Sequence, residues 1–277
     1  MNEKFWISNV LLENGFEYIN NYISGTLTKK ENLLIEDGTI INITEGSIPS
    51  DGIPVIDAKG LLALPSLYEK HIHLDKGHFG GPWKACTPFT NVFDRIKEEE
   101  NFLPKFLDFT KERAESLLDL ITKNGVTFAR VQCNVDPVIG MGNVERVSEA
   151  LRNYKDKLNY ELVAFPQHGL LKSNSISLMK DAMRNGVKVV GGLDPATIDN
   201  NVELSLEKMM DIAVEFDAEV DIHLHDGGSL GIYTIKQLCT FVEEAKWNNK
   251  VTISHGFCLG NSPINEVIEV AEKMAEL

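Results

Sequence analysis

The alternation of apolar and helix-compatible segments after residue 60 constrains the fold of this chain most strongly. Six apolar runs are separated by charged stretches, a texture typical of a parallel α/β fold. One charged stretch, "FTKERAESLLDLITKNG", places its leucines on one helical face and ends at Gly125, a helix stop signal. We predict strands at 61–74, 126–133, 160–169, 187–195, 219–228 and 251–257.

The first 60 residues have a different texture, with short β segments and turn residues. In "NLLIEDGTIINI", two alternating apolar runs flank Asp37 and Gly38, a pair that favours a tight β-hairpin. We therefore expect residues 1–60 to form a small β domain and residues 61–277 to form the larger α/β domain.

Composition limits the classes of function. The chain has 277 residues, 43% of them hydrophobic, which is enough to bury a sizeable core. Its net charge of −14 argues against binding to nucleic acid or to an anionic membrane surface. The four cysteines form no CxxC pair, and no segment resembles a signal peptide or a membrane span. We expect a protein of the reducing cytoplasm.

Histidines lie at the end of the first predicted strand, in the stretch "EKHIHLDKGH". Because strand side chains alternate between faces, His71 and His73 are expected to point to the same side. Parallel barrels collect the C-terminal ends of their strands at one face, where active sites form. Imidazoles and carboxylates meeting there would suit a divalent metal ion. The polar residues expected at these ends are His71, His73, Arg130 to Cys133, Gln167, His168, Asp194, His223 to Asp226, and His255.

Four ordered motifs carry a family resemblance: "VIDAKGLLALPSLYEKHIHLD", "VAFPQHG", "DIHLHD" and "VTISHG". Together they resemble the amidohydrolase superfamily, in the branch of bacterial cytosine deaminase and the isopropylammelide hydrolases, over essentially the whole chain. The resemblance implies a TIM-like (β/α)8 barrel, a small β-sandwich built from both chain ends, and one divalent Fe or Zn ion. It also leaves a homo-oligomer open.

The resemblance implies a role for six residues. His255 would polarise the substrate carbonyl or the water on the metal, and Gln167 would bind the substrate's amide-like edge. Asp226 stands where cytosine deaminases carry a glutamate that moves a proton to the ring nitrogen, so its shorter side chain points to a different substrate. Lys188 lies at the wrong end of its strand to bridge two metals, which favours one ion. The implied metal ligands are His71, His73 and His223.

These roles predict a hydrolase that cleaves a C–N bond in a small nitrogen heterocycle by metal-activated water. The predicted elements account for only six barrel strands, and the family's aspartate after strand 8 has no counterpart. We therefore expect a fragment of a longer enzyme. The alternatives are a non-catalytic fragment that binds metal or ligand without turnover, and an interaction protein whose acidic surface recruits a partner.

Several of these residues also have a purely structural interpretation. Gln167 would serve as a capping amide in a loop, Asp226 as a helix N-cap, and Asp194 as a turn residue before Pro195. Cys133 fits a small buried hydrophobe better than a site residue. The remaining ambiguous residues, which suit either a pocket or the surface, are His78, His168 and Trp83.

Overall fold

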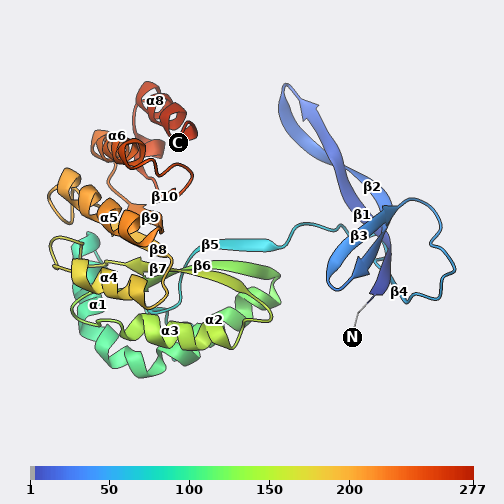
Figure 1. The fold of residues 1–277 in the computed structure, drawn as a ribbon, viewed down its shortest axis with the longest axis horizontal. Coiled ribbons are helices and arrows are strands. Elements are labelled where there is room, and N and C mark those ends of the chain that lie inside the picture. The colour runs from blue at the N-terminus through green and yellow to red at the C-terminus, as the bar shows by residue number, and fades with distance from the viewer. Residues whose placement is uncertain (1–3) are drawn as a thin grey trace. The chain divides into compact units, whose positions relative to one another are not determined.

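The computed structural model describes residues 4–277, and the chain divides into two compact units, with the boundary between Ser66 and Leu67 in the sequence (Figure 1). The first unit is a four-stranded sheet in the order β3-β2-β1-β4. β1, β2 and β3 pair antiparallel, and β4 pairs parallel to β1. Its strands are β1 (Lys4–Ile19), β2 (Tyr22–Glu36), β3 (Thr39–Thr44) and β4 (Val55–Asp57).

The predicted hairpin is confirmed at the turn between β2 and β3. Asp37 and Gly38 have φ angles of 49° and 77°, the left-handed values that a tight two-residue hairpin loop requires at both positions. Val10, Leu33 and Ile35 are buried together in the core of this sheet. The first unit therefore has an apolar core of its own.

The first predicted strand of the larger unit begins later than the sequence indicated. Residues 61–63 pair with β1 instead, because the Leu11 amide donates to the Leu61 carbonyl and the Ala63 amide donates to the Leu11 carbonyl. Pro65, which has no amide hydrogen to donate, separates this segment from the next strand. The strand that carries the histidines is therefore β5 (Leu67–His73), and the apolar run before it is not part of it.

The second unit contains one six-stranded sheet in the order β10-β9-β8-β7-β6-β5. All neighbours pair parallel, in chain order, so each connection crosses over through helical segments. The remaining strands are β6 (Val126–Asn134), β7 (Asn159–Phe165), β8 (Val189–Leu193), β9 (Glu219–Leu224) and β10 (Val251–His255). This is a half-barrel, which confirms the predicted fold class (Figure 1).

Helices follow the strands and pack their apolar faces on the sheet. Leu118, Val147 and Leu206, from three different helices, are fully buried in one cluster with Val131 and Val220 of the strands. The helices are α1 (Val92–Phe106), a 3-10 turn (Leu107–Phe109), α2 (Thr110–Lys123), α3 (Gly142–Arg152), α4 (Ile176–Arg184), α5 (Val202–Phe216), α6 (Gly228–Ala245), α7 (Cys258–Asn261) and α8 (Ile264–Ala275). Such a scaffold holds the C-terminal ends of the strands at one rim.

The predicted stop at the end of α2 is also present. The helix ends at Lys123, and Gly125 two residues later has a φ of 90°. A residue with a Cβ rarely adopts this conformation, whereas glycine does so without steric cost. The chain can then turn directly into β6.

Candidate metal centre

Three imidazoles meet at the rim formed by the C-terminal ends of β5 and β9. One nitrogen from each of His71, His73 and His223 can be chosen so that all three lie within 4.8 Å of one another. The first two come from the same face of β5, as strand alternation predicted, and the third comes from β9. The sheet thus brings together residues 150 positions apart in sequence.

The nitrogens of this cluster fit a metal ion better than they fit one another. His73 Nε2 and His223 Nε2 lie 3.4 Å apart, which is long for a hydrogen bond. Two nitrogens bound at typical distances to one tetrahedral zinc ion lie about 3.4 Å apart. His71 Nε2 is also buried and has no hydrogen-bond partner among the described residues. Buried polar atoms are rarely left without partners, so an additional ligand would complete the cluster.

Burial keeps these imidazoles neutral, which is the form that binds metals. Desolvation lowers the pKa of His73 and of His223 well below the usual 6.5, and the neighbouring imidazoles lower both pKa values further. Desolvation also lowers the pKa of His71. Phe165 at the end of β7 contributes to this apolar wall, because its ring stacks on His223 with centroids 4.1 Å apart.

His255 lies beside the cluster at the end of β10. Its ring centroid is 4.7 Å from that of His71 and 5.0 Å from that of His223. Desolvation, followed by the neighbouring imidazoles, lowers the pKa of His255 to about 4. Its φ of 70° is unusual for a residue with a Cβ, and such strain concentrates at functional sites. The residue therefore stands at the rim in neutral form, next to the proposed ligands.

Asp194 and His225 form a pair that the sequence interpretation missed. Asp194 accepts hydrogen bonds from the backbone amides of His225 and Asp226, and its second oxygen lies 2.7 Å from His225 Nδ1. The His225 ring stacks on His255 at 4.4 Å. Asp194 was interpreted as a turn residue, yet its side chain fixes the loop after β9. Asp194 directly follows the buried strand β8, and this position in the sequence could have indicated a role at the rim.

Gln167 is held in one orientation by Lys76. The lysine Nζ lies 2.8 Å from Gln167 Oε1 and 3.1 Å from Glu99 Oε2, so the ammonium bridges the amide and the carboxylate. Lysine can only donate, which assigns the oxygen of the Gln167 amide to Lys76 and leaves its NH2 group free to donate elsewhere. Gln167 is buried and is not simply a loop cap.

Asp226 lies just beyond β9 and does not cap the following helix. The N-cap of α6 is Gly227, and no side chain makes a capping hydrogen bond there. The Thr197 hydroxyl donates to Asp226 Oδ1, whereas Oδ2 is buried without a partner among the described residues. Desolvation raises the pKa of Asp226, with a further contribution from nearby Asp194. The carboxyl group is therefore easier to protonate than an exposed aspartate.

Arg130 does not belong to this rim, contrary to the sequence prediction. β6 continues to Asn134, which leaves Arg130 in mid-strand, and its long side chain reaches the beginnings of neighbouring strands. It donates to Glu161 and Glu219, lies 3.5 Å from Asp221 and contacts the Thr252 hydroxyl. This Arg130 cluster is a charge network at the opposite end of the sheet.

The other ambiguous residues lie away from the three imidazoles. His78 packs its ring on Phe102 and Phe106, and His168 lies 3.6 Å from Asp136. Cys133 is fully buried in the core, as the structural interpretation predicted, and desolvation raises the pKa of its thiol well above 9.0. Trp83 is largely exposed.

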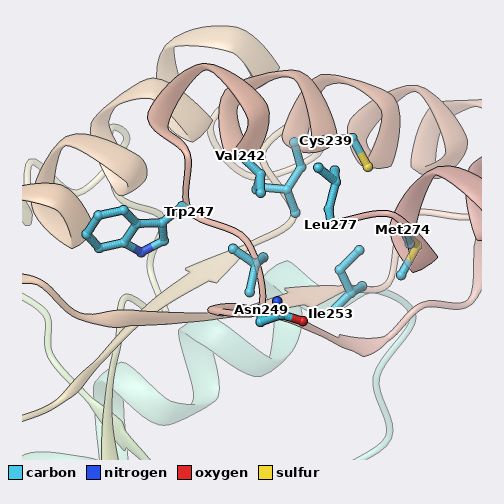
Figure 2. Close-up of a pocket in the computed structure, with 9 residues that line it drawn as sticks. Cys239, Val242, Trp247, Asn249, Ile253, Met274 and Leu277 are labelled. Carbon is cyan, nitrogen blue, oxygen red and sulfur yellow. The ribbon is translucent and has the colours of Figure 1, made fainter.

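A separate apolar pocket lies between α6, β10 and the C-terminal helix α8 (Figure 2). Its lining includes Val242, Trp247, Ile253 and Met274, with the Cys239 thiol at one side. None of the metal-centre histidines lines it. Among residues 4–277, no helix is both long and apolar enough to cross a membrane.

A parallel half-barrel with imidazoles gathered at the C-terminal rim defines the class of barrel proteins that can hold a metal ion at this rim. Comparison with known proteins narrows this class, although no family model matches the chain. The chain is 41% identical over 274 residues to the uncharacterized protein YahJ of Escherichia coli (strain K12). It is 32% identical over 224 residues to the N-isopropylammelide isopropyl amidohydrolase of Pseudomonas sp. (strain ADP).

These matches cover 98% and 79% of the chain, and the chain spans 60% and 55% of the lengths of the two relatives. The crystal structure of N-isopropylammelide isopropylaminohydrolase from Burkholderia multivorans has a TM-score of 0.86 and is 29% identical. That match covers 99% of this chain and 66% of the other. The chain belongs to the amidohydrolase superfamily, among the relatives of the isopropylammelide hydrolases.

Proposed function

We propose that this protein is a metal-dependent amidohydrolase of the cytosine deaminase type, which hydrolyses a C–N bond in a small nitrogen heterocycle. The observation that carries the proposal is that one nitrogen from each of His71, His73 and His223 lies within 4.8 Å of the others, and that His71 Nε2 is buried without a partner among the described residues. Two of the related proteins, from Pseudomonas sp. and Burkholderia multivorans, are named as isopropylammelide hydrolases, which supports a substrate of the triazine or pyrimidine kind.

The metal ligands in this proposal are His71, His73 and His223, and the ion is zinc or iron. Bound there, a divalent ion would supply a Lewis acid that activates water at neutral pH. The proposal also assigns the first unit to part of a small β-sandwich and the second unit to an incomplete barrel, with the boundary expected at residue 60 moved to Ser66 by the pairing of residues 61–63 with β1.

The remaining groups of the rim bind the substrate and move protons. Gln167, with its carbonyl oxygen bound to Lys76, presents its NH2 group and therefore suits a substrate with a carbonyl or ring-nitrogen acceptor. His255, neutral next to His71, would orient the reacting carbonyl, and Asp226 would carry a proton to the ring nitrogen or the leaving amine. Burial raises the pKa of Asp226, which favours this acid–base role.

Metal content of the purified protein tests the proposal directly. Elemental analysis should find about one zinc or iron ion per chain, in line with a single site built from three protein ligands. The double variant His71→Ala, His73→Ala should lose that ion, whereas the control His78→Ala should keep it because His78 packs on phenylalanine rings elsewhere. Soluble wild-type protein that binds no added zinc or iron would overturn the proposed metal site.

Activity is tested separately, with ammonia or amine release measured over a panel of cytosine-like and triazine-like amines. Gln167→Ala and Asp226→Asn should each reduce turnover while leaving the metal content unchanged, because neither is a proposed ligand. A metal-loaded protein that hydrolyses none of the panel would favour the alternative of binding without turnover.

A further inference from the structure

A series of hydrogen-bonded side chains lies behind His71, the proposed ligand, and takes no part in the proposed function. His71 Nδ1 is 2.9 Å from the Ser254 hydroxyl oxygen, and Ser254 comes from β10, 183 residues further along the chain. The same hydroxyl donates to Asp221 Oδ1 at 2.6 Å. Asp221 Oδ2 faces Arg130 at 3.5 Å. This series of hydrogen bonds therefore connects the Arg130 cluster to the proposed metal centre.

The direction of each hydrogen bond follows from the donors available. Arg130 can only donate, so Asp221, fully buried against it, acts as an acceptor. Ser254 has a single hydroxyl hydrogen, and it is used on Asp221. At its contact with His71 the hydroxyl must then accept, which places the imidazole hydrogen on Nδ1.

This arrangement matters because a neutral imidazole binds a metal through the nitrogen without a hydrogen. With Nδ1 protonated, the lone pair of His71 is on Nε2, the atom that is buried without a partner. The Ser254 contact also fixes the rotation of the ring about its Cβ. Both effects would prepare the free protein for the ion before it arrives.

We propose that Ser254 and Asp221 are positioning residues that set the tautomer and orientation of His71 and so raise the metal affinity of the site. The inference rests on the proposed function, since it takes His71 as a metal ligand. Ser254 and Asp221 touch neither the ion nor the substrate in this proposal. Arg130 acts one step further back, by keeping Asp221 an acceptor.

The tautomer of His71 can be measured in wild-type protein stripped of metal. Two-bond proton–nitrogen NMR correlations, assigned with a His71→Gln sample, should show hydrogen on Nδ1 and a bare Nε2 at a pH where the ring is neutral. Hydrogen on Nε2 would overturn the inference, whatever the metal content of the protein.

The second readout is the dissociation constant for Zn²⁺, measured by competition with a chromophoric chelator and without substrate. Ser254→Ala should weaken binding by roughly 10- to 100-fold, the usual effect of losing the partner of a ligating histidine. Ser254→Thr keeps a hydroxyl and suits a strand, so it should bind as wild type does. The matched control is Ser205→Ala. Ser205 lies on α5, and its hydroxyl also donates to a carboxylate at 2.6 Å, that of Asp199.

The outcomes separate the inference from the proposed function. Wild-type affinity in Ser254→Ala would overturn the positioning role and leave the metal site intact. Equal weakening in Ser254→Ala and Ser205→Ala would also overturn it, since both would then report a general loss of structure. Wild-type protein that binds neither added zinc nor added iron overturns the proposed function and, with it, the effect on metal affinity. The NMR measurement would then still test the tautomer of His71.

Discussion

The two ends of the parallel sheet each carry a polar cluster, and the clusters differ in whether their atoms have partners. At the N-terminal ends of the strands, the Arg130 guanidinium contacts the carboxylates of Glu161, Glu219 and Asp221. At the C-terminal ends, the three histidines of the proposed metal centre each keep a buried ring nitrogen without a partner in the described chain, which is Nε2 in His71 and Nδ1 in the other two. One cluster is complete within the protein, and the other is not.

This difference separates a structural network from a binding site. A buried charge is tolerated when it is paired and hydrogen-bonded, and the Arg130 cluster meets this condition. Unpaired buried nitrogens cost free energy unless something outside the chain binds them. We expect substitutions in the first cluster to affect mainly folding, and substitutions of the three histidines to affect mainly metal binding. Asp221 connects the two clusters through Ser254, so its substitution should affect both.

The largest expected effect is on folding stability when Arg130 is removed. Arg130→Met leaves the fully buried Asp221 without its ion-pair partner, which should lower the free energy of unfolding by about 3–5 kcal/mol. Urea denaturation followed by circular dichroism would measure this loss. The control Arg184→Met breaks an exposed ion pair with Asp181 and should change stability little. Exposed ion pairs contribute up to about 1 kcal/mol. A loss in that range for Arg130→Met would contradict the view that the Arg130 cluster is a structural network.

A smaller effect is expected from adding metal. Zn²⁺ at about 100 times its dissociation constant should raise the free energy of unfolding by about 2.7 kcal/mol, because it binds the folded state selectively. His223→Ala should abolish this gain, since it removes the ligand contributed by β9. Glu161→Gln, in the Arg130 cluster, should retain it. Urea denaturation with and without Zn²⁺ measures this gain in the free energy of unfolding. If His223→Ala gained as much as wild type, the ion would bind elsewhere.

The sequence predicted the sheet well because its strands are short apolar runs with clear punctuation. β6 to β10 lie within or next to the predicted ranges, and the turn at Asp37 and Gly38 is where expected. The error at 61–74 arose because an apolar run before Pro65 resembles a buried strand whichever unit it joins. Its pairing with β1 is a long-range contact that local pattern cannot reveal.

The site was predicted in part, for a similar reason. Strand alternation places His71 and His73 on one face, and parallel pairing adds His223 from another strand. Arg130 was placed at the wrong end because the length of its side chain, rather than its strand position, decides where its charge lies. The contact of Asp194 with His225 depends on a loop conformation, which residue spacing does not specify.

The smallest expected effect is a pH dependence of stability that arises at the histidine end alone. Burial lowers the pKa of His73 and His223 below the usual 6.5, so in metal-free protein the unfolded chain takes up protons that the folded state does not. Stability should therefore be intact above that pH and fall on acidification below it, with each such imidazole contributing up to about 1.4 kcal/mol per pH unit.

Denaturation of chelator-treated protein between about pH 5.5 and 7.5 (about one unit either side of the usual histidine pKa) tests this. His73→Gln removes one buried imidazole, so its stability should fall less steeply with acid than that of wild type. Glu161→Gln alters no imidazole and should shift stability by a similar amount across this range. If both variants keep the wild-type slope, the acid sensitivity does not arise from the buried imidazoles. The unpaired nitrogens at the histidine end of the sheet would then not make that end more sensitive to acid than the Arg130 end.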